Sequence, residues 1–149
     1  MRKSKTRHDA RRAKADLDVA LRRTEEQLAE AHWELAAELS TLADATNDPA
    51  PLIQAVEALR TATRFYTFDT APREHALIQQ SIADTLLTLG RRTGDREALT
   101  TARDAYRGAI TLASLLSDES LREDLRVNYK LTLTLLGDRP RSPSLFKVA

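Results

Sequence analysis

The chain has 149 residues, of which 42% are hydrophobic and 30% are charged, and its formal net charge is +1. A near-neutral charge argues against a protein that coats nucleic acid with its whole surface. The sequence contains no cysteine, which excludes disulfides, thiolate catalysis and cysteine-ligated metals. No apolar run approaches the ~18 residues of a membrane span, and no apolar signal segment begins the chain, so a cytoplasmic location is expected.

Basic side chains are concentrated at the start of the chain. Residues 1–9 hold nothing to bury, and we expect them to form a disordered basic arm. Seven cations fall within the first 14 residues: Arg2, Lys3, Lys5, Arg7, Arg11, Arg12 and Lys14. Such an arm suits nucleic-acid phosphates, an acidic protein or an anionic lipid surface, or it serves only to keep the chain in solution.

A long helix is expected over residues 10–46, because no glycine or proline interrupts residues 1–48. Its apolar positions follow a mainly 4-3-4-3 spacing, close to a heptad repeat. These positions are Leu17, Leu21, Thr24, Leu28, Ala31, Leu35, Leu39 and Leu42. Three interpretations stay open: the first half of the helix projects from the other helices, folds back over one end of a helical stack, or pairs with another copy as a coiled-coil dimer.

Four further helices are expected, over residues 49–66, 72–92, 95–116 and 121–136, followed by an irregular tail over residues 138–149. Asn47 and Gly94 suit the left-handed residue that ends a helix, and Gly137 closes the last one. Asp95 suits the N-cap of the fourth helix, and Ser120 with a glutamate three residues later fits a capping box for the fifth. Few glycines and prolines and abundant Ala, Leu, Arg and Glu support one all-α domain over residues 10–137.

An internal repeat supports this division. Residues 33–62 align with residues 80–109 without a gap, and eleven of the thirty positions are identical. The matches fall mostly at core and cap positions. The same offset of 47 residues carries Leu86, Leu89 and Gly90 onto Leu133, Leu136 and Gly137 at the end of the last helix. We therefore expect that helix to be the first half of a third unit, which caps the stack.

The second unit resembles the tetratricopeptide repeat family. Ala102, Tyr106 and Ala109 reproduce the small–aromatic–small signature of that repeat's second helix, and residues 82–83 with Leu86 match its first helix. The run LxxLGRRTGDxxxLxxAxxAYRxA is similar to a longer variant associated with bacterial proteins. The resemblance implies an α-solenoid of antiparallel helix pairs with a C-terminal capping helix. It also implies a non-catalytic protein that binds proteins or peptides in the groove lined by the first helices.

Motifs for catalysis or cofactor binding are not found in the sequence. The three histidines show no HExxH spacing, no phosphate-binding loop is present, and no serine lies in a nucleophile-elbow context. We therefore expect no enzymatic activity, no metal and no cofactor.

Aligning the repeat places one set of residues on the groove side of the first helices: Trp33, Glu34, Gln80, Asp84, Leu87 and Asn128. Trp33 is the only tryptophan and acts either as an anchor for a partner or as a core residue. The expected function is an adaptor or scaffold that binds another protein through this groove or through the long helix. The alternatives are a structural homo-oligomer formed by that helix, and a nucleic-acid accessory protein with a basic arm.

Overall fold

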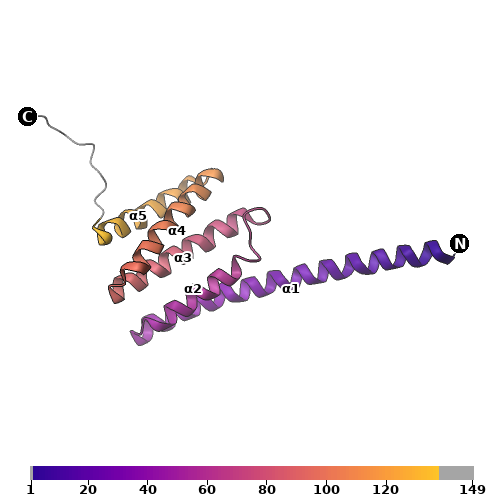
Figure 1. Cartoon of the computed structure of the whole chain (residues 1–149), viewed down its shortest axis with the longest axis horizontal. Coiled ribbons are helices and arrows are strands. Elements are labelled where there is room, and N and C mark those ends of the chain that lie inside the picture. The colour runs from indigo at the N-terminus through magenta and orange to yellow at the C-terminus, as the bar shows by residue number, and fades with distance from the viewer. Residues whose placement is uncertain (1, 138–149) are drawn as a thin grey trace, which may run out of the picture.

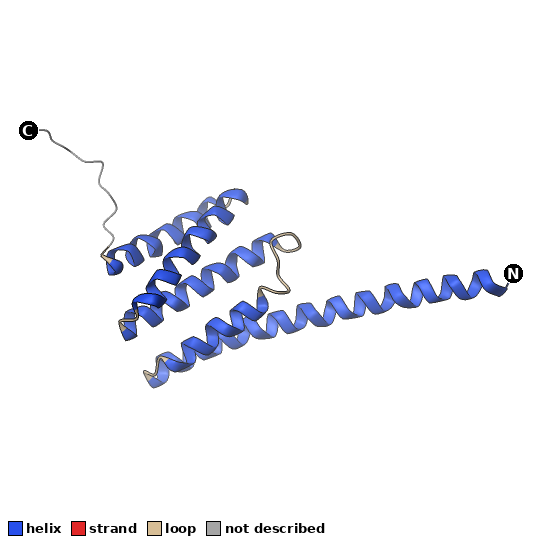
Figure 2. Cartoon of the chain, viewed as in Figure 1, coloured by secondary structure: helices blue, strands red, loops and turns tan. Residues whose placement is uncertain are grey.

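The computed structural model describes the backbone of residues 2–137 and the side chains of residues 5–137. The expected tail over residues 138–149 lies outside this part. Within it the structure is all-α and contains no strand, as the sequence predicts (Figures 1 and 2). The five helices are α1 (Arg2–Thr46), α2 (Ala50–Ala62), α3 (Pro72–Thr93), α4 (Arg96–Leu115) and α5 (Glu119–Leu136).

The first helix begins much earlier than expected. It starts at Arg2, so the prediction of a disordered arm over residues 1–9 is wrong for residues 2–9. The physical reason is that extending an existing helix fixes one residue for each hydrogen bond gained, whereas starting a helix is costly. Lysine, arginine and alanine are good helix formers, and no glycine or proline stops the extension.

Consecutive helices pack against one another, α1 on α2, α2 on α3, α3 on α4 and α4 on α5, and α3 also touches α5. The C-terminal half of α1 lies beside α2, whereas its N-terminal half extends away from the other helices (Figure 1). Every side chain described from Lys5 to Thr24 is exposed. The first half of α1 therefore projects instead of folding over an end of the stack.

The core repeats with the 47-residue offset seen in the sequence. Ala55 and Ala62 in α2, and Ala102 and Ala109 in α4, are all fully buried. Between each pair of alanines lies a large buried side chain, Leu59 in α2 (1% exposed) and Tyr106 in α4 (0% exposed). Small residues on both sides allow the neighbouring backbones to approach, and the large residue fills the space between them.

Local chemistry ends and starts the helices where the sequence predicts. Asn47, Gly94 and Gly137 adopt positive φ angles of 54°, 72° and 78°. The Asp95 side chain accepts hydrogen bonds from the backbone N–H groups of Glu97 and Ala98. These groups have no partner within the helix, so the cap stabilises the start of α4.

Apart from the start of α1, two boundaries differ from the expected ones by more than one residue. Helix α2 ends at Ala62 instead of residue 66. Beyond it the α-helical pattern changes to turn-type hydrogen bonds between residues three apart, such as the bond from the Phe65 N–H to the Ala62 carbonyl. Helix α5 begins at Glu119, two residues early, and its N-cap is Asp118 instead of Ser120. The Asp118 carboxylate reaches the Leu121 N–H at 3.0 Å and takes the place of the expected capping box.

Candidate functional site

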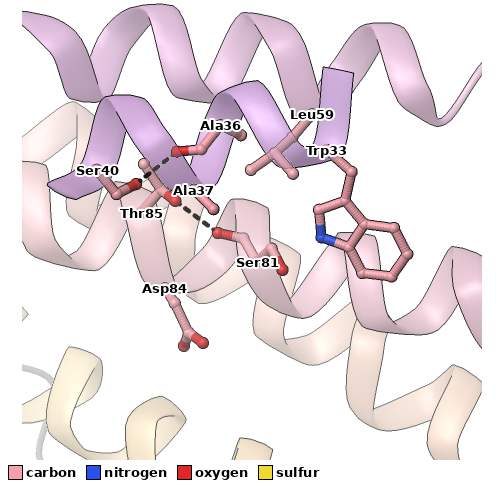
Figure 3. Close-up of a pocket in the computed structure, with 8 residues that line it drawn as sticks. All are labelled: Trp33, Ala36, Ala37, Ser40, Leu59, Ser81, Asp84 and Thr85. Carbon is pink, nitrogen blue, oxygen red and sulfur yellow. Dashed lines mark hydrogen bonds between the residues drawn. The ribbon is translucent and has the colours of Figure 1, made fainter. Parts of the chain in front are cut away.

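A shallow groove runs between α1 and α3, with the side chain of Leu59 from α2 at its base. It holds a cavity of about 210 Å³. Figure 3 shows the lining residues: Trp33, Ala36, Ala37, Ser40, Leu59, Ser81, Asp84 and Thr85. A second hollow continues along the same two helices past Asp44 and Thr88. The groove is therefore walled by helices from separate parts of the chain and is accessible to a partner segment.

Trp33 stands at one end of the groove, half-buried. Its indole packs edge-to-face on the ring of Tyr66, with ring centroids 6.2 Å apart. Burial, and then the nearby carboxylates of Glu30, Glu26 and Glu74, raise the pKa of Tyr66. Trp33 both packs against the core and lines the cavity.

The hydroxyl groups of the groove donate to their own helices. Ser40 donates to the carbonyl of Ala36 at 2.9 Å, and Thr85 donates to the carbonyl of Ser81 at 2.7 Å (Figure 3). Ser81 donates in the same way to the carbonyl of Leu77. A hydroxyl oxygen that has donated its hydrogen still has lone pairs, so these groups suit a partner that supplies N–H donors.

Two of the predicted groove residues bind each other. Asn128 of α5 donates from Nδ2 to Asp84 Oδ1 of α3 at 3.0 Å, and the buried hydroxyl of Tyr106 in α4 donates to the same oxygen at 2.5 Å. In Figure 3 the Asp84 side chain points away from Trp33. Burial, and then the hydrogen bond and charge of Asp84, raise the pKa of Tyr106. This cluster joins three helices, so its first role is structural.

The other predicted groove residues differ in exposure. Glu34 is exposed on α1, and Gln80 is half-buried on α3. Leu87 is buried in the core, with only 5% of its surface exposed. A partner therefore has access to Glu34 and Gln80 but to very little of Leu87.

A second candidate surface lies along α1. Seven of the eight heptad-spaced positions predicted from the sequence are exposed, and we call them the leucine seam: Leu17, Leu21, Thr24, Leu28, Ala31, Leu35 and Leu42. Its leucines expose between 44% (Leu35) and 68% (Leu17) of their surface. Leu39 is the exception, because it packs against the core.

A different face of α1 contacts the other helices. Ala29, Ala36 and Ala43 recur every seven residues and are buried, each one position after a leucine of the seam. Successive residues of an α-helix are about 100° apart around its axis. The seam therefore faces solvent well away from the α2 contact, and helices α2 to α5 do not cover it.

Charge along α1 is strongly segregated. Residues 2–14 contain seven Lys and Arg against one Asp, whereas residues 25–46 contain six Asp and Glu and no Lys or Arg. The described cations Lys5, Arg7, Arg11, Arg12 and Lys14 are all exposed. Arg7, Ala10 and Lys14 follow the spacing of the seam and continue its face toward the N-terminus.

Among the described residues, no group of three His, Cys, Asp or Glu side chains is placed to hold a metal ion. No helix in this part of the chain is long and apolar enough to cross a membrane. Comparisons with family models, curated proteins and solved structures found no match to this chain. The groove and the leucine seam are therefore interpreted from their own chemistry.

Proposed function

We propose that the chain is a non-enzymatic adaptor, with a tetratricopeptide-like arrangement of helix pairs, that binds a segment of another protein in the groove between α1 and α3. The observation that carries the proposal is the half-buried Trp33 at the end of a cavity walled by two helices. A large aromatic side chain that is already held in place by packing loses little conformational freedom when it contacts a partner. Tryptophan is also among the residues that contribute most to protein interfaces.

The groove chemistry favours a particular kind of segment. The exposed methyl group of Ala37 provides apolar surface beside the indole, above the buried side chains of Ala36 and Leu59, which suits one small apolar side chain of the partner. The serine and threonine oxygens accept hydrogen bonds. Burial raises the pKa of Tyr66, the aromatic neighbour of Trp33, and the carboxylates of Glu30, Glu26 and Glu74 lie close enough to raise it further. We therefore propose a partner segment that carries an apolar residue next to a basic one.

The test begins with affinity capture from extracts of the cells that produce the protein. Peptides from each captured protein are then titrated while the fluorescence of Trp33 is recorded, since it is the only tryptophan in the chain. Binding in the groove changes the environment of the indole and shifts its emission. Trp33→Ala removes this signal, so its affinity is measured by isothermal titration calorimetry; the substitution is expected to weaken binding by about 2 kcal/mol, roughly thirtyfold in Kd.

A second variant separates binding from folding. Ala37 is exposed and lines the cavity, so Ala37→Arg fills the groove without entering the core. The matched control is Ala15→Arg, at an exposed position on the projecting half of the same helix. The proposal requires Ala37→Arg to lose the partner and Ala15→Arg to keep it. Equal binding by both variants would refute a role for the groove.

A further inference from the structure

We infer that α1 pairs with α1 of a second copy of this chain, as an antiparallel coiled coil along the leucine seam. The dimer goes beyond the proposed function, because the groove takes no part in it. The five leucines of the seam are exposed over the 26 residues from Leu17 to Leu42, a length of roughly 38 Å. A row of exposed leucines of this length on a projecting helix marks an interaction surface.

The distribution of charge along α1 indicates that its partner is a second copy of α1 and that the two helices run in opposite directions. The helix is basic at its N-terminal end and acidic over its C-terminal half. Turning a second copy end over end places the basic end of each helix toward the acidic half of the other. A parallel pair instead sets seven cations beside seven cations, which repel one another. The helix is thus complementary to itself in the antiparallel direction.

The spacing of the seam, together with the charges of Lys14 and Glu38, selects one register. A heptad seam alternates between two kinds of position, a and d. When one helix of the pair is reversed, each a position lies opposite a d position of the partner. Centring the pair on Glu26 gives five distinct layers, each occurring twice: Leu42 opposite Ala10, Glu38 opposite Lys14, Leu35 opposite Leu17, Ala31 opposite Leu21, and Leu28 opposite Thr24.

These layers are compatible in size and charge. Leucine faces alanine or threonine in three of them, so large and small side chains alternate across the interface. Glu38 and Lys14 are the two charged residues within the seam region, and in this register they face each other. In a parallel pair each would face its own copy, placing like charges in one layer.

The rest of the chain leaves room for this arrangement. Because α2 contacts the alanine face of α1, the helices α2 to α5 of each copy lie outside the pair. The antiparallel direction then places the two groups of helices at opposite ends of the coiled coil. The dimer would display two copies of the groove, far apart and related by a twofold axis.

Molar mass tests the dimer. Light scattering of the wild-type chain is expected to give twice the 16.7 kDa of one chain. Leu28→Glu places a charge at the middle of the seam and should give a monomer that retains its helical circular dichroism. Leu115→Glu is the matched control, because Leu115 is 66% exposed on α4, away from the seam, and this variant should remain dimeric.

Charge exchange tests the direction and the register. Lys14→Glu alone, or Glu38→Lys alone, is expected to weaken dimerisation by about tenfold or more. The double variant Lys14→Glu, Glu38→Lys exchanges the partners in each layer and should restore the wild-type Kd. A parallel dimer predicts no loss from either single exchange, because each residue would face a like charge on its own copy before and after the change.

Disulfide trapping gives an independent check in a chain without natural cysteines. Under mild oxidation, Lys14→Cys mixed with Glu38→Cys should form a covalent heterodimer. Lys14→Cys alone should not, because its two copies would lie roughly 36 Å apart along the antiparallel pair.

Several outcomes would overturn the inference. A monomeric wild-type chain at the highest soluble concentration would do so, as would a dimer unaffected by Leu28→Glu. Self-crosslinking of Lys14→Cys would replace the antiparallel dimer with a parallel one. None of these results changes the binding of a partner in the groove, which Ala37→Arg reports separately.

Discussion

Two glycines within helices provide a test of packing in which alanine should have opposite effects. Gly90 lies in the last turns of α3 and Gly108 in the middle of α4. A Cβ atom at Gly90 would lie 2.6 Å from Cγ and Cδ2 of Leu99, whereas at Gly108 it would meet nothing within 4 Å. Alanine at Gly108 thus adds only helix propensity, while at Gly90 it also collides with the start of α4.

The expected magnitudes follow from these distances. Gly108→Ala should raise the unfolding free energy by about 0.5–1 kcal/mol. At Gly90 the contact falls about 0.8 Å short of ordinary van der Waals separation, and overpacking of this kind costs about 1–3 kcal/mol. Leu99 is buried, and the Asp95 carbonyl lies 3.2 Å away on another side, so the neighbours have little room to move. The higher helix propensity of alanine offsets part of this cost, so Gly90→Ala should lower the unfolding free energy by about 1–2 kcal/mol.

Urea unfolding followed by circular dichroism measures both variants, at one protein concentration so that any dimerisation affects them equally. The two urea midpoints should move in opposite directions, and the unfolding free energies of the two variants should differ by about 2 kcal/mol. Equal stabilisation by both alanines would refute the close approach of α4 to Gly90. Destabilisation by Gly108→Ala would show that its surroundings are not open.

Two further predictions concern Tyr106 and Asp95. Because burial and then the bond to Asp84 raise the pKa of Tyr106, stability from this group is complete below the ordinary value of 10.0 and is lost as pH rises above it. Tyr106→Phe should lower the unfolding free energy by about 1.5–3 kcal/mol at neutral pH. Above pH 10.0 the wild type should lose about 1.4 kcal/mol per pH unit through this group, and the variant should not. Urea unfolding at several pH values measures both effects. Asp95→Ala leaves the N–H groups of Glu97 and Ala98 without their cap and should cost about 1 kcal/mol, whereas Asp95→Asn should cost much less; equal losses would contradict the capping role.

The helices and their ends could be predicted from the sequence because local chemistry decides them. Asn47, Gly94 and Gly137 end helices since these residues adopt positive φ at little cost, and Asp95 caps α4 through atoms only two and three residues away. The start of α1 differs from the prediction. A charged segment without apolar residues indicates disorder, but no glycine or proline in residues 2–9 stops the helix.

The candidate site depends on contacts that the sequence does not reveal. Asp84 and Asn128 were placed on the groove side by alignment of the repeat, but their hydrogen bond joins residues 44 positions apart. Tyr106 matches the aromatic position of the repeat signature, but only the structure shows that its hydroxyl reaches Asp84 across 22 positions. A carboxylate that is available to a partner and one that is bound within the fold look the same in the sequence.

The sequence by itself determined that α1 is helical and that leucines recur along one face of it. Only the tertiary structure decided which face is buried: the small residues Ala29, Ala36 and Ala43 turn inward, while the leucine seam remains in solvent. The physical reason is that hydrophobicity depends on composition, whereas packing depends on shape. Two backbones approach most closely through alanines, so α2 packs on the alanine face and leaves the leucines exposed.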